Sequence, residues 1–445
     1  MLHNKKIFIL GMARSGFEVA KLVAPDNTIL ITDMKEASGS DLKVLNELNV
    51  TFVCSSNQEE LLDETFDLVI KNPGISEDVK VIKKAASLGI PVLNELEVSF
   101  HYLPNSVNLT SITGSNGKTT TTTLIYEMLK KDNLRTFVGG NIGIPLASFV
   151  KDCKPGDFVV LEVSDHQLKN TLEFNSHVTV LTNIFPVHLD FHGDYETYKN
   201  TKKKIFMNQS KYDVAIINKD NEEAVNLTKD IKGIKKYFSL QSKSDAYYEN
   251  GVLYYNGNEI MATKDIKLIG NHNLENILAA ICAVKEYGVS DEAIRSVLSS
   301  FKGVPHRIEY VTNFYNVAFY NDSKSTNCEA TITALSSFKT PVILILGGLD
   351  RGHSFEPLKP YLNNVKFIAA IGETKERIKE FCVQEHIACE TYNTLKEAVM
   401  ASYAKAVAYD TILLSPACAS WDMYPSFEVR GDEFKSIVKS LESEE

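Results

Sequence analysis

The chain has 445 residues, of which 44% are hydrophobic and 23% charged, and its formal net charge is −10. One hydrophobic core rarely serves more than about 300 residues, so we expect two or three domains. The negative charge argues against non-specific binding to nucleic acid, and no apolar run approaches the roughly 18 residues that a membrane-spanning helix needs.

Neither the N-terminus nor the cysteines indicate export. Gly11 closes the apolar run Ile7–Leu10 before the core of a signal peptide could form, so this run predicts a first β-strand. The seven cysteines are scattered without a C-x-x-C pair, which argues against a zinc ribbon and a disulfide framework. We therefore expect a cytoplasmic protein whose partners include neither a membrane nor nucleic acid.

Strand and helix signals alternate along the first hundred residues. This alternation predicts a parallel sheet with right-handed crossover connections. Because the last signal lies close to residue 97, we place a domain boundary there. The predicted elements are strands at 7–11, 28–32, 68–70 and 91–95 and a helix at 16–23.

The first turn of this sheet, Gly11–Gly16, resembles a dinucleotide-binding fingerprint in which Ala13 replaces the middle glycine. Asp33, at the end of the second strand, stands where an acid would bind a ribose hydroxyl. A βαβ unit without any cofactor would use the same tight turn. The missing glycine hinders close approach to a pyrophosphate, so a related nucleotide bound in another way is a further alternative.

A glycine-bearing loop, Gly114–Thr120, joins a predicted strand at 107–113 to a predicted helix. Backbone N–H groups and the helix dipole favour an anion there, Lys118 can reach terminal phosphate oxygens, and the Thr119 hydroxyl suits Mg2+. The loop is shorter than the general phosphate-loop pattern. An ordinary strand-to-helix turn with a solvated lysine is the alternative.

Two further strands of this region lead to residues that can bind metal. Glu162 comes late in the apolar strand at 157–164, where a phosphate-loop enzyme commonly holds Mg2+. His188 and Asp190 follow the strand at 178–183, beyond the carboxyl end at which open α/β sheets bind ligands. A strand-end acid that faces solvent is the alternative for Glu162.

The end of this region carries motifs with ordinary structural explanations. Residues 195–207 predict a helix, in which Lys202–Lys204 is a lysine run of the kind that usually forms a solvated face. Asn256-Gly257 indicates a hairpin turn. The asparagines of Gly270–Asn276 precede an apolar helix at 277–284 and are typical of a helix cap.

A composition break at Gly303 opens a third α/β region. Polar clusters follow two of its strands, at Ser323–Asn327 and Gly347–Gly352, and indicate a site rather than a core. The acidic tail Glu442–Glu445 is expected to be frayed. The predicted strands are at 317–322, 342–346, 367–371 and 411–414.

Taken together, these motifs resemble those of the Mur ligases, ATP-dependent enzymes that form amide bonds in peptidoglycan precursor synthesis. The resemblance covers the chain almost end to end, and the shortened phosphate loop is the form that this family uses. The matching motifs are Thr113–Thr119, Gly139–Gly143, Glu162–Ser164, His188–Asp190, Tyr198 with Lys202, His272–Asn276, Pro305–Arg307, Asn321–Asn327 and Ser415–Ser420.

The resemblance implies an α/β protein of three domains. Residues 1–97 would form a Rossmann-like domain that binds the UDP-sugar, 98–303 a central phosphate-loop ATPase-like domain with a parallel sheet, and 304–445 a Rossmann-like domain that binds the amino acid. The implied reaction adds D-glutamate to UDP-N-acetylmuramoyl-L-alanine through an acyl-phosphate, with ATP and two Mg2+ ions. We expect a monomer.

The resemblance also assigns roles residue by residue. ATP would be bound by Gly114, Ser115, Asn116, Gly117, Lys118, Thr119, Thr120, Asn273, Asn276, His306, Arg307 and Asp322. The UDP-sugar would be bound by Arg14, Ser15, Asp33, Lys35, Asn72, Gly74 and Asn141, and D-glutamate by Thr326, Arg351, Ser420 and Phe427. Metal ions would be held by Thr119, Glu162, His188 and Lys202, the last as a carbamate. The catalytic residues would be Lys118, His188, Lys202 and Lys324.

Two positions depart from the family pattern. Asp165-His166 stands where many relatives have Ser-Phe, close to Glu162, and the sequence does not reveal its effect. Arg351 replaces the usual lysine in the loop after Gly347-Gly348. Its guanidinium can bind a carboxylate through two parallel hydrogen bonds, which suits a dicarboxylic substrate.

Two other functions compete with this one. A family member that adds L-alanine, a diamino acid or a dipeptide, or a folylpolyglutamate synthase, would share the phosphate loop. The Asn321–Asn327 motif and the Rossmann-like first domain favour D-glutamate. A non-catalytic nucleotide sensor would keep only the fold, and the presence of Lys118, Glu162, His188 and Lys202 argues against it.

Overall fold

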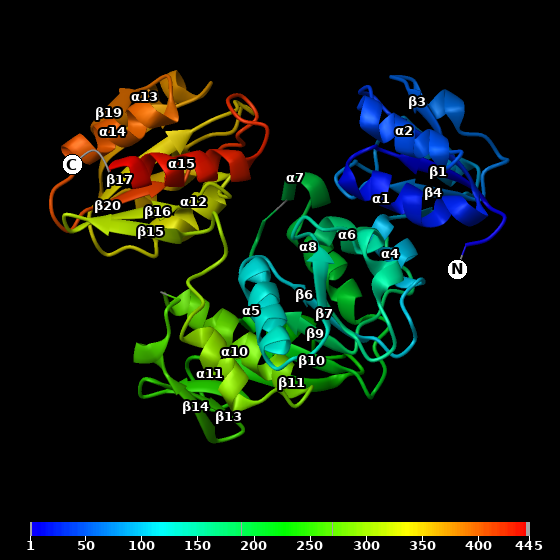
Figure 1. Cartoon of the computed structure of the whole chain (residues 1–445), viewed down its shortest axis with the longest axis horizontal. Helices are drawn as coiled ribbons and strands as arrows, with labels where there is room; N and C mark the ends of the chain where they lie inside the picture. Colours follow the sequence, from blue (N-terminus) through cyan, green and yellow to red (C-terminus); the bar gives the residue numbers. More distant parts are fainter. Residues whose placement is uncertain (1, 188, 269, 442–445) are drawn as a thin grey trace. The chain divides into compact units, whose positions relative to one another are not determined.

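A computed structural model describes residues 2–187, 189–268 and 270–441 (Figure 1). The chain divides into two compact units, Met1–Ser300 and Phe301–Glu445. Within the described residues it forms three sheets in sequence, each with helices around it, which confirms the predicted α/β class. The predicted boundaries at 97 and 303 stay predictions, and the acidic tail at 442–445 lies outside the described residues.

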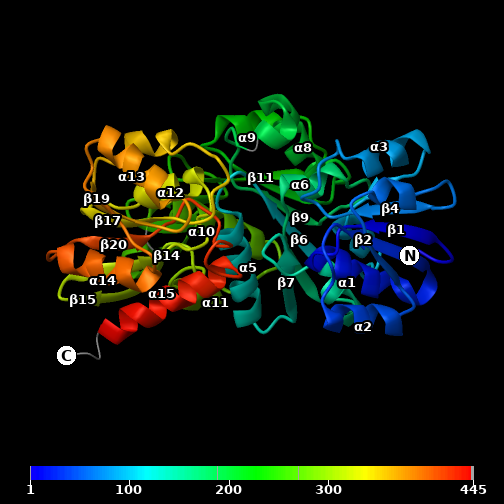
Figure 2. The same ribbon diagram turned by 90° about the horizontal axis from the view of Figure 1, so that it is seen from above.

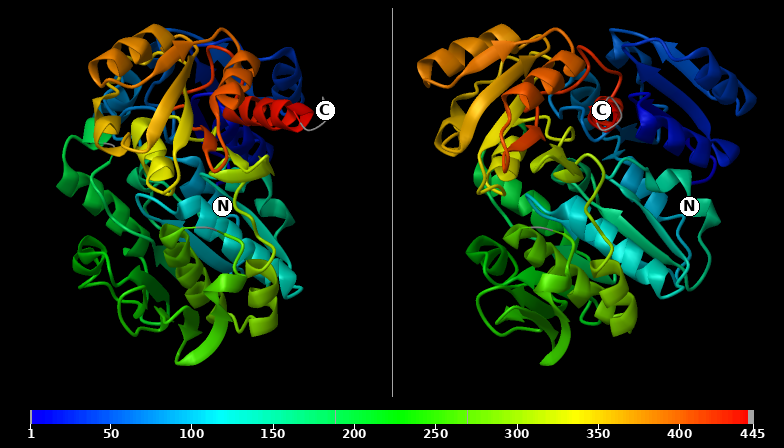
Figure 3. Two further views of the ribbon diagram at one scale, coloured as in Figure 1. Left: turned by 90° about the vertical axis from the view of Figure 1, so that its left-hand side faces the viewer. Right: turned by 60° about the vertical axis from the view of Figure 1, so that its left-hand side comes forward.

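The first sheet has the strand order β3-β2-β1-β4-β5 and is parallel, as predicted. Its blue strands run side by side in Figure 3. Ile7 and Ile9 pack into a core with Val19, whereas Phe8 and Leu10 pack into another, so both faces of the sheet are covered. The strands are β1 (Lys6–Leu10), β2 (Thr28–Asp33), β3 (Thr51–Cys54), β4 (Leu68–Lys71) and β5 (Val92–Leu93), and the helices are α1 (Arg14–Val23), α2 (Gly39–Glu47) and α3 (Lys80–Ser87).

Two details of this region differ from the prediction. The strand β3 was not predicted, because it lies at the sheet edge and none of its residues is fully buried. The predicted strand at 91–95 is only Val92–Leu93, since the Asn94 side chain accepts a hydrogen bond from the backbone N–H of Glu97 and so caps helix α4 (Glu95–Phe100).

The central sheet has the order β14-β13-β12-β11-β10-β9-β6-β8-β7. It is parallel from β7 to β12, and β13 and β14 extend it as an antiparallel hairpin. The strands are β6 (Asn108–Thr113), β7 (Thr136–Gly140), β8 (Phe158–Glu162), β9 (Val178–Leu181), β10 (Val214–Asn218), β11 (Ile234–Ser239), β12 (Ala246–Glu249), β13 (Val252–Tyr255) and β14 (Asn258–Ala262). The helices are α5 (Lys118–Lys131), α6 (Asp165–Lys169), α7 (Leu189–His192), α8 (Tyr195–Lys203), α9 (Glu222–Leu227), α10 (Asn271–Lys285) and α11 (Asp291–Leu298).

Most predicted elements of this region are confirmed. Asn256 and Gly257 both have positive φ angles, 48° and 80°, as a tight turn between β13 and β14 requires. The helix predicted at 195–207 ends earlier, at Lys203, and continues as a 3-10 turn at Lys204–Phe206. Helix α5 packs against α10 and α11 (Figure 1), which brings the loop before α5 close to the start of α10.

The third sheet has the order β15-β16-β20-β17-β18-β19 and is parallel except for β15. Helices α12 and α13 supply one core, and α14 and α15 supply the core on the other face (Figure 2). The elements are β15 (Glu309–Phe314), β16 (Val317–Asn321), β17 (Val342–Gly347), β18 (Val365–Ile371), β19 (Cys389–Thr391), β20 (Thr411–Leu414), α12 (Cys328–Leu335), α13 (Lys375–Gln384), α14 (Leu395–Lys405) and α15 (Phe427–Leu441).

A search of the described helices finds none that combines the length and the apolar composition needed to cross a membrane.

Candidate active site

The loop between β6 and α5 is shaped by two glycines. Gly114 and Gly117 have φ angles of 148° and 83°, which other residues rarely adopt. A Cβ atom at Gly114 would lie 2.0 Å from the Thr182 hydroxyl oxygen, and one at Gly117 would lie 2.1 Å from Oδ1 of Asn276. The short spacing between the glycines therefore belongs to a loop that is wedged between the end of β9 and helix α10.

Side chains and backbone from two elements hold this loop in shape. The backbone N–H of Ser115 donates to the Asn183 carbonyl at 2.9 Å, and that of Asn116 donates to the Asn183 side chain at 2.9 Å. The Ser115 hydroxyl lies 2.7 Å from the Tyr198 hydroxyl. Lys118 donates from Nζ to the carbonyl oxygens of Gly114 and Ser115 at 2.8 and 3.0 Å, so its cation lies over the loop. Such a fixed loop with a cation over it can bind a phosphate.

Asn273 and Asn276 lie inside helix α10 and do not cap it. The cap position is Gly270, so the capping interpretation is wrong for these two asparagines. Asn276 donates from Nδ2 to Oδ1 of Asn273 at 3.2 Å, and its own Oδ1 accepts from the Thr121 hydroxyl at 3.3 Å. These two predicted ATP contacts therefore lie beside the phosphate loop.

Lys202 is fully buried rather than on a solvated face. Its Nζ lies 3.4 Å from Oδ1 of Asp165 and 3.5 Å from the Thr113 hydroxyl. Burial, together with the nearby Lys118 cation, lowers the pKa of Lys202 to about 7 against the opposing pull of Asp165. A lysine with so low a pKa is partly neutral near pH 7, as carbamate formation requires.

Asp165, which departs from the family pattern, lies between Lys202 and two histidines. Its Oδ2 accepts a hydrogen bond from Nε2 of His192 at 2.8 Å and lies 3.2 Å from Nδ1 of His166, while its Oδ1 faces Lys202. Burial lowers the pKa of His192. The sequence flagged Asp165 as a departure but gave no sign that His192 would be its partner, because this contact depends on how α6 packs against α7 and α8.

Glu162 ends β8 and is 2% exposed, so the interpretation that it faces solvent is wrong. Its Oε1 accepts a hydrogen bond from the Asn141 side chain at 2.8 Å, which joins a predicted metal ligand to a predicted substrate contact. Its carboxylate and the buried hydroxyl of Thr119 are hard oxygen donors of the kind that Mg2+ prefers. His188 lies outside the described residues, and among the described ones no group of three His, Cys, Asp or Glu could hold a metal.

Six of the seven predicted UDP-sugar contacts gather at the carboxyl ends of β1, β2 and β4, whereas Asn141 follows β7 of the central sheet. Asp33 accepts from the backbone N–H of Met12 at 2.7 Å and of Lys35 at 3.0 Å, so it braces the first turn. A Cβ atom at Gly11 would lie 3.0 Å from the Cβ atom of Asn72, so glycine at position 11 allows the two loops to approach closely. Arg14, next to Ser15, donates to the carbonyl of Gly143 in the central region, and Gly74 donates its N–H to the Asn72 side chain.

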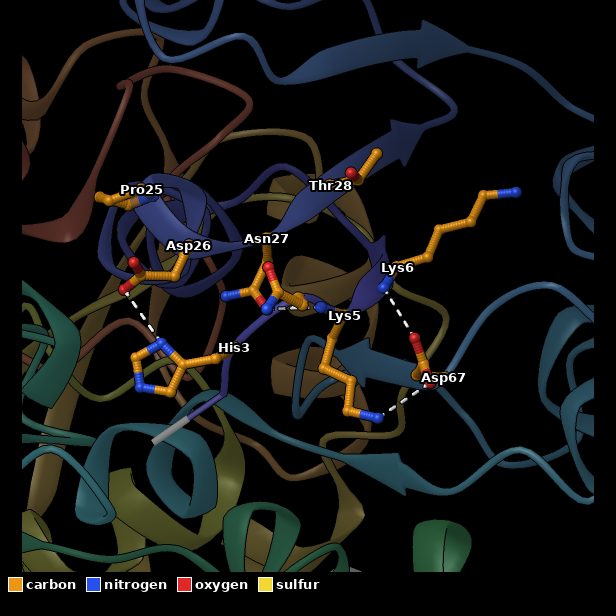
Figure 4. A pocket seen from close by; sticks show the side chains of 9 residues that line it. His3, Lys5, Lys6, Pro25, Asp26, Asn27, Thr28 and Asp67 are labelled. Atoms are coloured by element: carbon orange, nitrogen blue, oxygen red, sulfur yellow. Dashed lines mark hydrogen bonds and ion pairs between the residues drawn. The ribbon is translucent and has the colours of Figure 1, made fainter.

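A hollow of about 650 Å³ opens at the opposite, amino-terminal ends of β1 and β2 (Figure 4). Its charged groups pair with one another: His3 lies 3.6 Å from Asp26, and Lys5 lies 3.1 Å from Asp67. Because parallel sheets bind ligands at the carboxyl ends of their strands, this hollow is not part of the candidate site.

In the C-terminal unit a second cluster surrounds Asp322, which follows β16. Its carboxylate accepts hydrogen bonds from the Ser415 hydroxyl at 2.6 Å, from the backbone N–H of Ile308 at 3.1 Å and from the Ser325 hydroxyl. Burial raises the pKa of Asp322 to about 6, with Arg307 acting against the shift. His306 is buried nearby and pairs through Nδ1 with the Asn321 side chain at 3.0 Å.

Arg430, on α15, was not predicted as part of this cluster. It is 1% exposed and donates from Nε to the Ser323 hydroxyl at 2.9 Å, and from Nη2 to the carbonyls of Ser323 at 2.9 Å and Cys418 at 3.1 Å. It therefore fastens the loop after β16 to the loop after β20. Lys324 stands in the first of these loops, and its Nζ lies 5.8 Å from the centre of the Phe427 ring.

The predicted amino-acid contacts come from neighbouring strands. Thr326, Arg351 and Ser420 follow β16, β17 and β20, which are adjacent in the order β16-β20-β17, and Phe427 begins α15. The carboxyl ends of these parallel strands meet at one edge of the sheet, where an α/β domain binds ligands. The structure thus places the predicted ATP and metal residues of the central region around one loop and the predicted amino-acid residues at one edge of the third sheet.

Comparisons with known proteins show to which family the chain is similar. Family sequence models match residues 112–284 as the Mur ligase middle domain and residues 306–418 as the Mur ligase glutamate ligase domain. The chain is 44% identical over 444 residues to a UDP-N-acetylmuramoylalanine–D-glutamate ligase of Geobacillus kaustophilus, with 98% of each chain covered.

Solved structures share the fold at lower identity. A UDP-N-acetylmuramate–alanine ligase of Thermotoga maritima matches with a TM-score of 0.63 and 19% identity, covering 99% of this chain and 100% of that one. A further Mur ligase of Thermotoga maritima, solved with ADP, matches with a TM-score of 0.57 and 17% identity over 99% and 96% of the two chains. The chain therefore belongs to the Mur ligase family.

Proposed function

We propose that this chain joins D-glutamate to UDP-N-acetylmuramoyl-L-alanine, with hydrolysis of ATP to ADP and phosphate, in peptidoglycan precursor synthesis. The observation that carries the proposal is the 44% identity over 98% of the chain to a ligase with this activity in its name. The phosphate loop beside Asn273 and Asn276 supports ATP as the energy source, as does the related ligase solved with ADP.

The residues of the central region fit an ATP site with Mg2+. Thr119 and Glu162 would hold the ion through oxygen, with His188 and carbamylated Lys202 as ligands of a second ion. Mg2+ would there neutralise phosphate charge and polarise the transferring group. Lys118 donates to a carbonyl of the same loop, so its cation would lie close to the γ-phosphate and stabilise the negative charge that develops there during transfer.

The chemistry requires cations because both reactants are anions. Two unit charges about 4 Å apart repel by about 1 kcal/mol in water but about 4 kcal/mol at an effective dielectric constant near 20. Lys118 and Lys324 would offset this repulsion when the alanyl carboxylate attacks the γ-phosphate to form an acyl-phosphate. The amine of D-glutamate would then attack the acyl carbon, and phosphate would leave.

The C-terminal unit would supply the residues that bind the amino acid and some of those that bind ATP. Thr326, Arg351, Ser420 and Phe427 would receive D-glutamate, while His306, Arg307 and Asp322 would contact ATP. Arg14, Ser15, Asp33, Lys35, Asn72, Gly74 and Asn141 would bind the UDP-sugar.

Phosphate release tests the proposal. The purified chain is mixed with ATP, Mg2+ and UDP-N-acetylmuramoyl-L-alanine, and release is followed for each candidate amino acid. Release with D-glutamate alone is expected. Release with L-lysine or glycine but not with D-glutamate would assign another ligase of the family, and no release with any of them would favour a nucleotide sensor. A monomeric state, a cytoplasmic location and the absence of membrane or nucleic-acid partners remain predictions.

A further inference from the structure

The loops that follow β17 and β20 are fastened to each other. The backbone N–H of Gly347 donates to the Pro416 carbonyl at 2.8 Å, and that of Leu349 donates to the Ala419 carbonyl at 2.9 Å. A Cβ atom at Gly348 would lie 2.3 Å from the Ala419 carbonyl oxygen, so glycine is what lets the two backbones approach. The side chains that follow this contact are therefore held at fixed relative positions.

Arg351 and Trp421 each stand two residues beyond the Leu349–Ala419 contact. The guanidinium carbon of Arg351 lies over the Trp421 ring, 5.0 Å from its centre. Trp421 is 65% exposed and is the only tryptophan in the chain. A large aromatic side chain left in solvent gains little from burial, whereas a cation over its ring face is a favourable contact.

The charge of Arg351 is available to a ligand. Its neighbour Asp350 accepts hydrogen bonds from the Arg377 guanidinium and from the backbone N–H of Gly352 at 2.8 Å, so this carboxylate is turned away. Across the described ranges no carboxylate forms an ion pair with Arg351. The N–H groups lie in the guanidinium plane, and an aromatic ring over one face leaves them able to bind an anion.

A buried hydroxyl beside the stack also points to a ligand. Ser420 is 2% exposed and lies between Ala419 and Trp421, and its Oγ has no hydrogen-bond partner among the residues described. An unpaired buried hydroxyl is costly, and a polar ligand that accepts its hydrogen bond would remove this cost. A carboxylate would satisfy both this hydroxyl and Arg351.

We propose that Trp421 is a positioning residue that holds the Arg351 guanidinium ready to bind a carboxylate of the acidic amino-acid substrate. The inference rests on the proposed function and assigns a part of its amino-acid selectivity. A free arginine loses side-chain freedom when it binds a ligand, and contact with a rigid ring removes part of that freedom beforehand. Trp421 should therefore strengthen the binding of the amino acid and not of ATP, because neither Arg351 nor Trp421 belongs to the cluster around the phosphate loop.

Steady-state kinetics on the full chain test this role. Trp421→Leu should raise KM for D-glutamate about 3- to 10-fold, with kcat and KM for ATP unchanged, because an exposed cation–π contact is weak. Trp421→Phe keeps an aromatic face and should recover most of the loss. Tyr361→Leu, which removes another exposed aromatic ring of the same unit, is the control and should change neither constant.

The double variant separates positioning from a structural effect. Arg351→Ala alone should raise KM for D-glutamate more than Trp421→Leu does, and Trp421→Leu should add nothing in the Arg351→Ala background. Independent, multiplying effects of the two substitutions would overturn the proposal. An equal rise in KM for ATP, or a fall in kcat alone, would also overturn it.

Emission from the single tryptophan gives a readout that does not require turnover. With ADP and UDP-N-acetylmuramoyl-L-alanine present, D-glutamate should change the emission saturably in the wild type and not in Arg351→Ala. If the wild type does not use D-glutamate, the proposed function fails, and the titration is repeated with L-glutamate, D-aspartate and L-aspartate. A change that depends on Arg351 supports the role of Trp421, and no change with all four overturns it.

Discussion

The two clusters of candidate residues each bury an ionisable group, and burial shifts the two pKa values in opposite directions. Around the phosphate loop, burial and, after it, the nearby Lys118 cation lower the pKa of Lys202 to about 7. Around β16, burial raises the pKa of Asp322 to about 6, although hydroxyl and N–H groups donate hydrogen bonds to its carboxylate. Arg430 is buried close to it and lies against neutral oxygens.

This difference distinguishes residues expected to act in the reaction from residues that hold the loops of the site in place. The Lys118 cation over the loop suits a phosphate-bearing ligand, whereas Lys202, with its lowered pKa, is suited to become a carbamate. Asp322 accepts hydrogen bonds from the loops around it and Arg430 donates to them, so the second cluster first holds the loops that carry Lys324 and Ser420. Substitutions in the first cluster should therefore reduce activity, and substitutions in the second should also change stability.

Lys118→Ala should have the largest effect, a fall in kcat of about 1,000-fold or more, because it removes the cation nearest the γ-phosphate. The melting temperature should stay close to that of the wild type. Lys131→Ala, in the last turn of the same helix, is the matched control and should retain activity. If Lys118→Ala kept kcat within a few-fold, the loop would not be the phosphate site.

Lys202→Ala should reduce turnover by about 100- to 1,000-fold, and small carboxylic acids should restore part of it by replacing the carbamate. The measurement is phosphate release with and without added acetate or formate. Lys203→Ala, a half-buried neighbour that pairs with Asp230, should behave as the wild type. Near-normal activity of Lys202→Ala would remove the carbamate from the mechanism.

Arg430→Met should lower the free energy of unfolding of the C-terminal unit by about 3 kcal/mol, because it leaves the buried oxygens that now accept from the guanidinium without donors. Urea denaturation followed by circular dichroism measures the change. Lys439→Met, exposed on the same helix, should shift the value by less than about 0.5 kcal/mol. A neutral result for Arg430→Met would mean that the loops are held by other contacts.

Asp322→Asn should have the smallest effect and the opposite sign. The folded-state pKa of about 6 lies above the ordinary value of 3.8, so ionisation costs stability as pH rises from about 4 to 6. At pH 7.5 the variant should be more stable than the wild type by about 1 to 2 kcal/mol, and the two should converge below pH 4.

Comparing the two proteins across pH isolates Asp322 from other groups. Burial also raises the pKa of Glu95 to about 7, but Glu95 is present in both proteins and cancels in the difference. A variant that is less stable than the wild type at pH 7.5 would show that the ionised carboxylate stabilises its loops.

The sequence predicted the strands best where they are buried on both faces. The apolar runs 342–346 and 411–414 match β17 and β20, because a short run of apolar residues is typical of a strand that is buried on both faces. The half-buried edge strand β3 has no such run and was missed. The turn at Asn256-Gly257 was readable because its positive φ angles need those residue types.

The candidate site was predicted where a motif is local, and missed where tertiary packing makes it. Gly114–Thr119 stands in one stretch of chain, so its chemistry could be read directly. Arg430 looks like any charged residue of an amphipathic helix, and its burial against Ser323 depends on a contact across more than a hundred positions. The Asp165–His192 pair depends in the same way on how short helices pack.

Identification of the product tests the central claim most directly. The chain is incubated with ATP, Mg2+, UDP-N-acetylmuramoyl-L-alanine and 15N-labelled D-glutamate, and the nucleotide products are separated and analysed by mass spectrometry. We predict a UDP-linked product that carries one labelled glutamate in amide linkage, with one ADP formed for each product. Labelled product with glycine or L-lysine but never with D-glutamate would contradict the assignment.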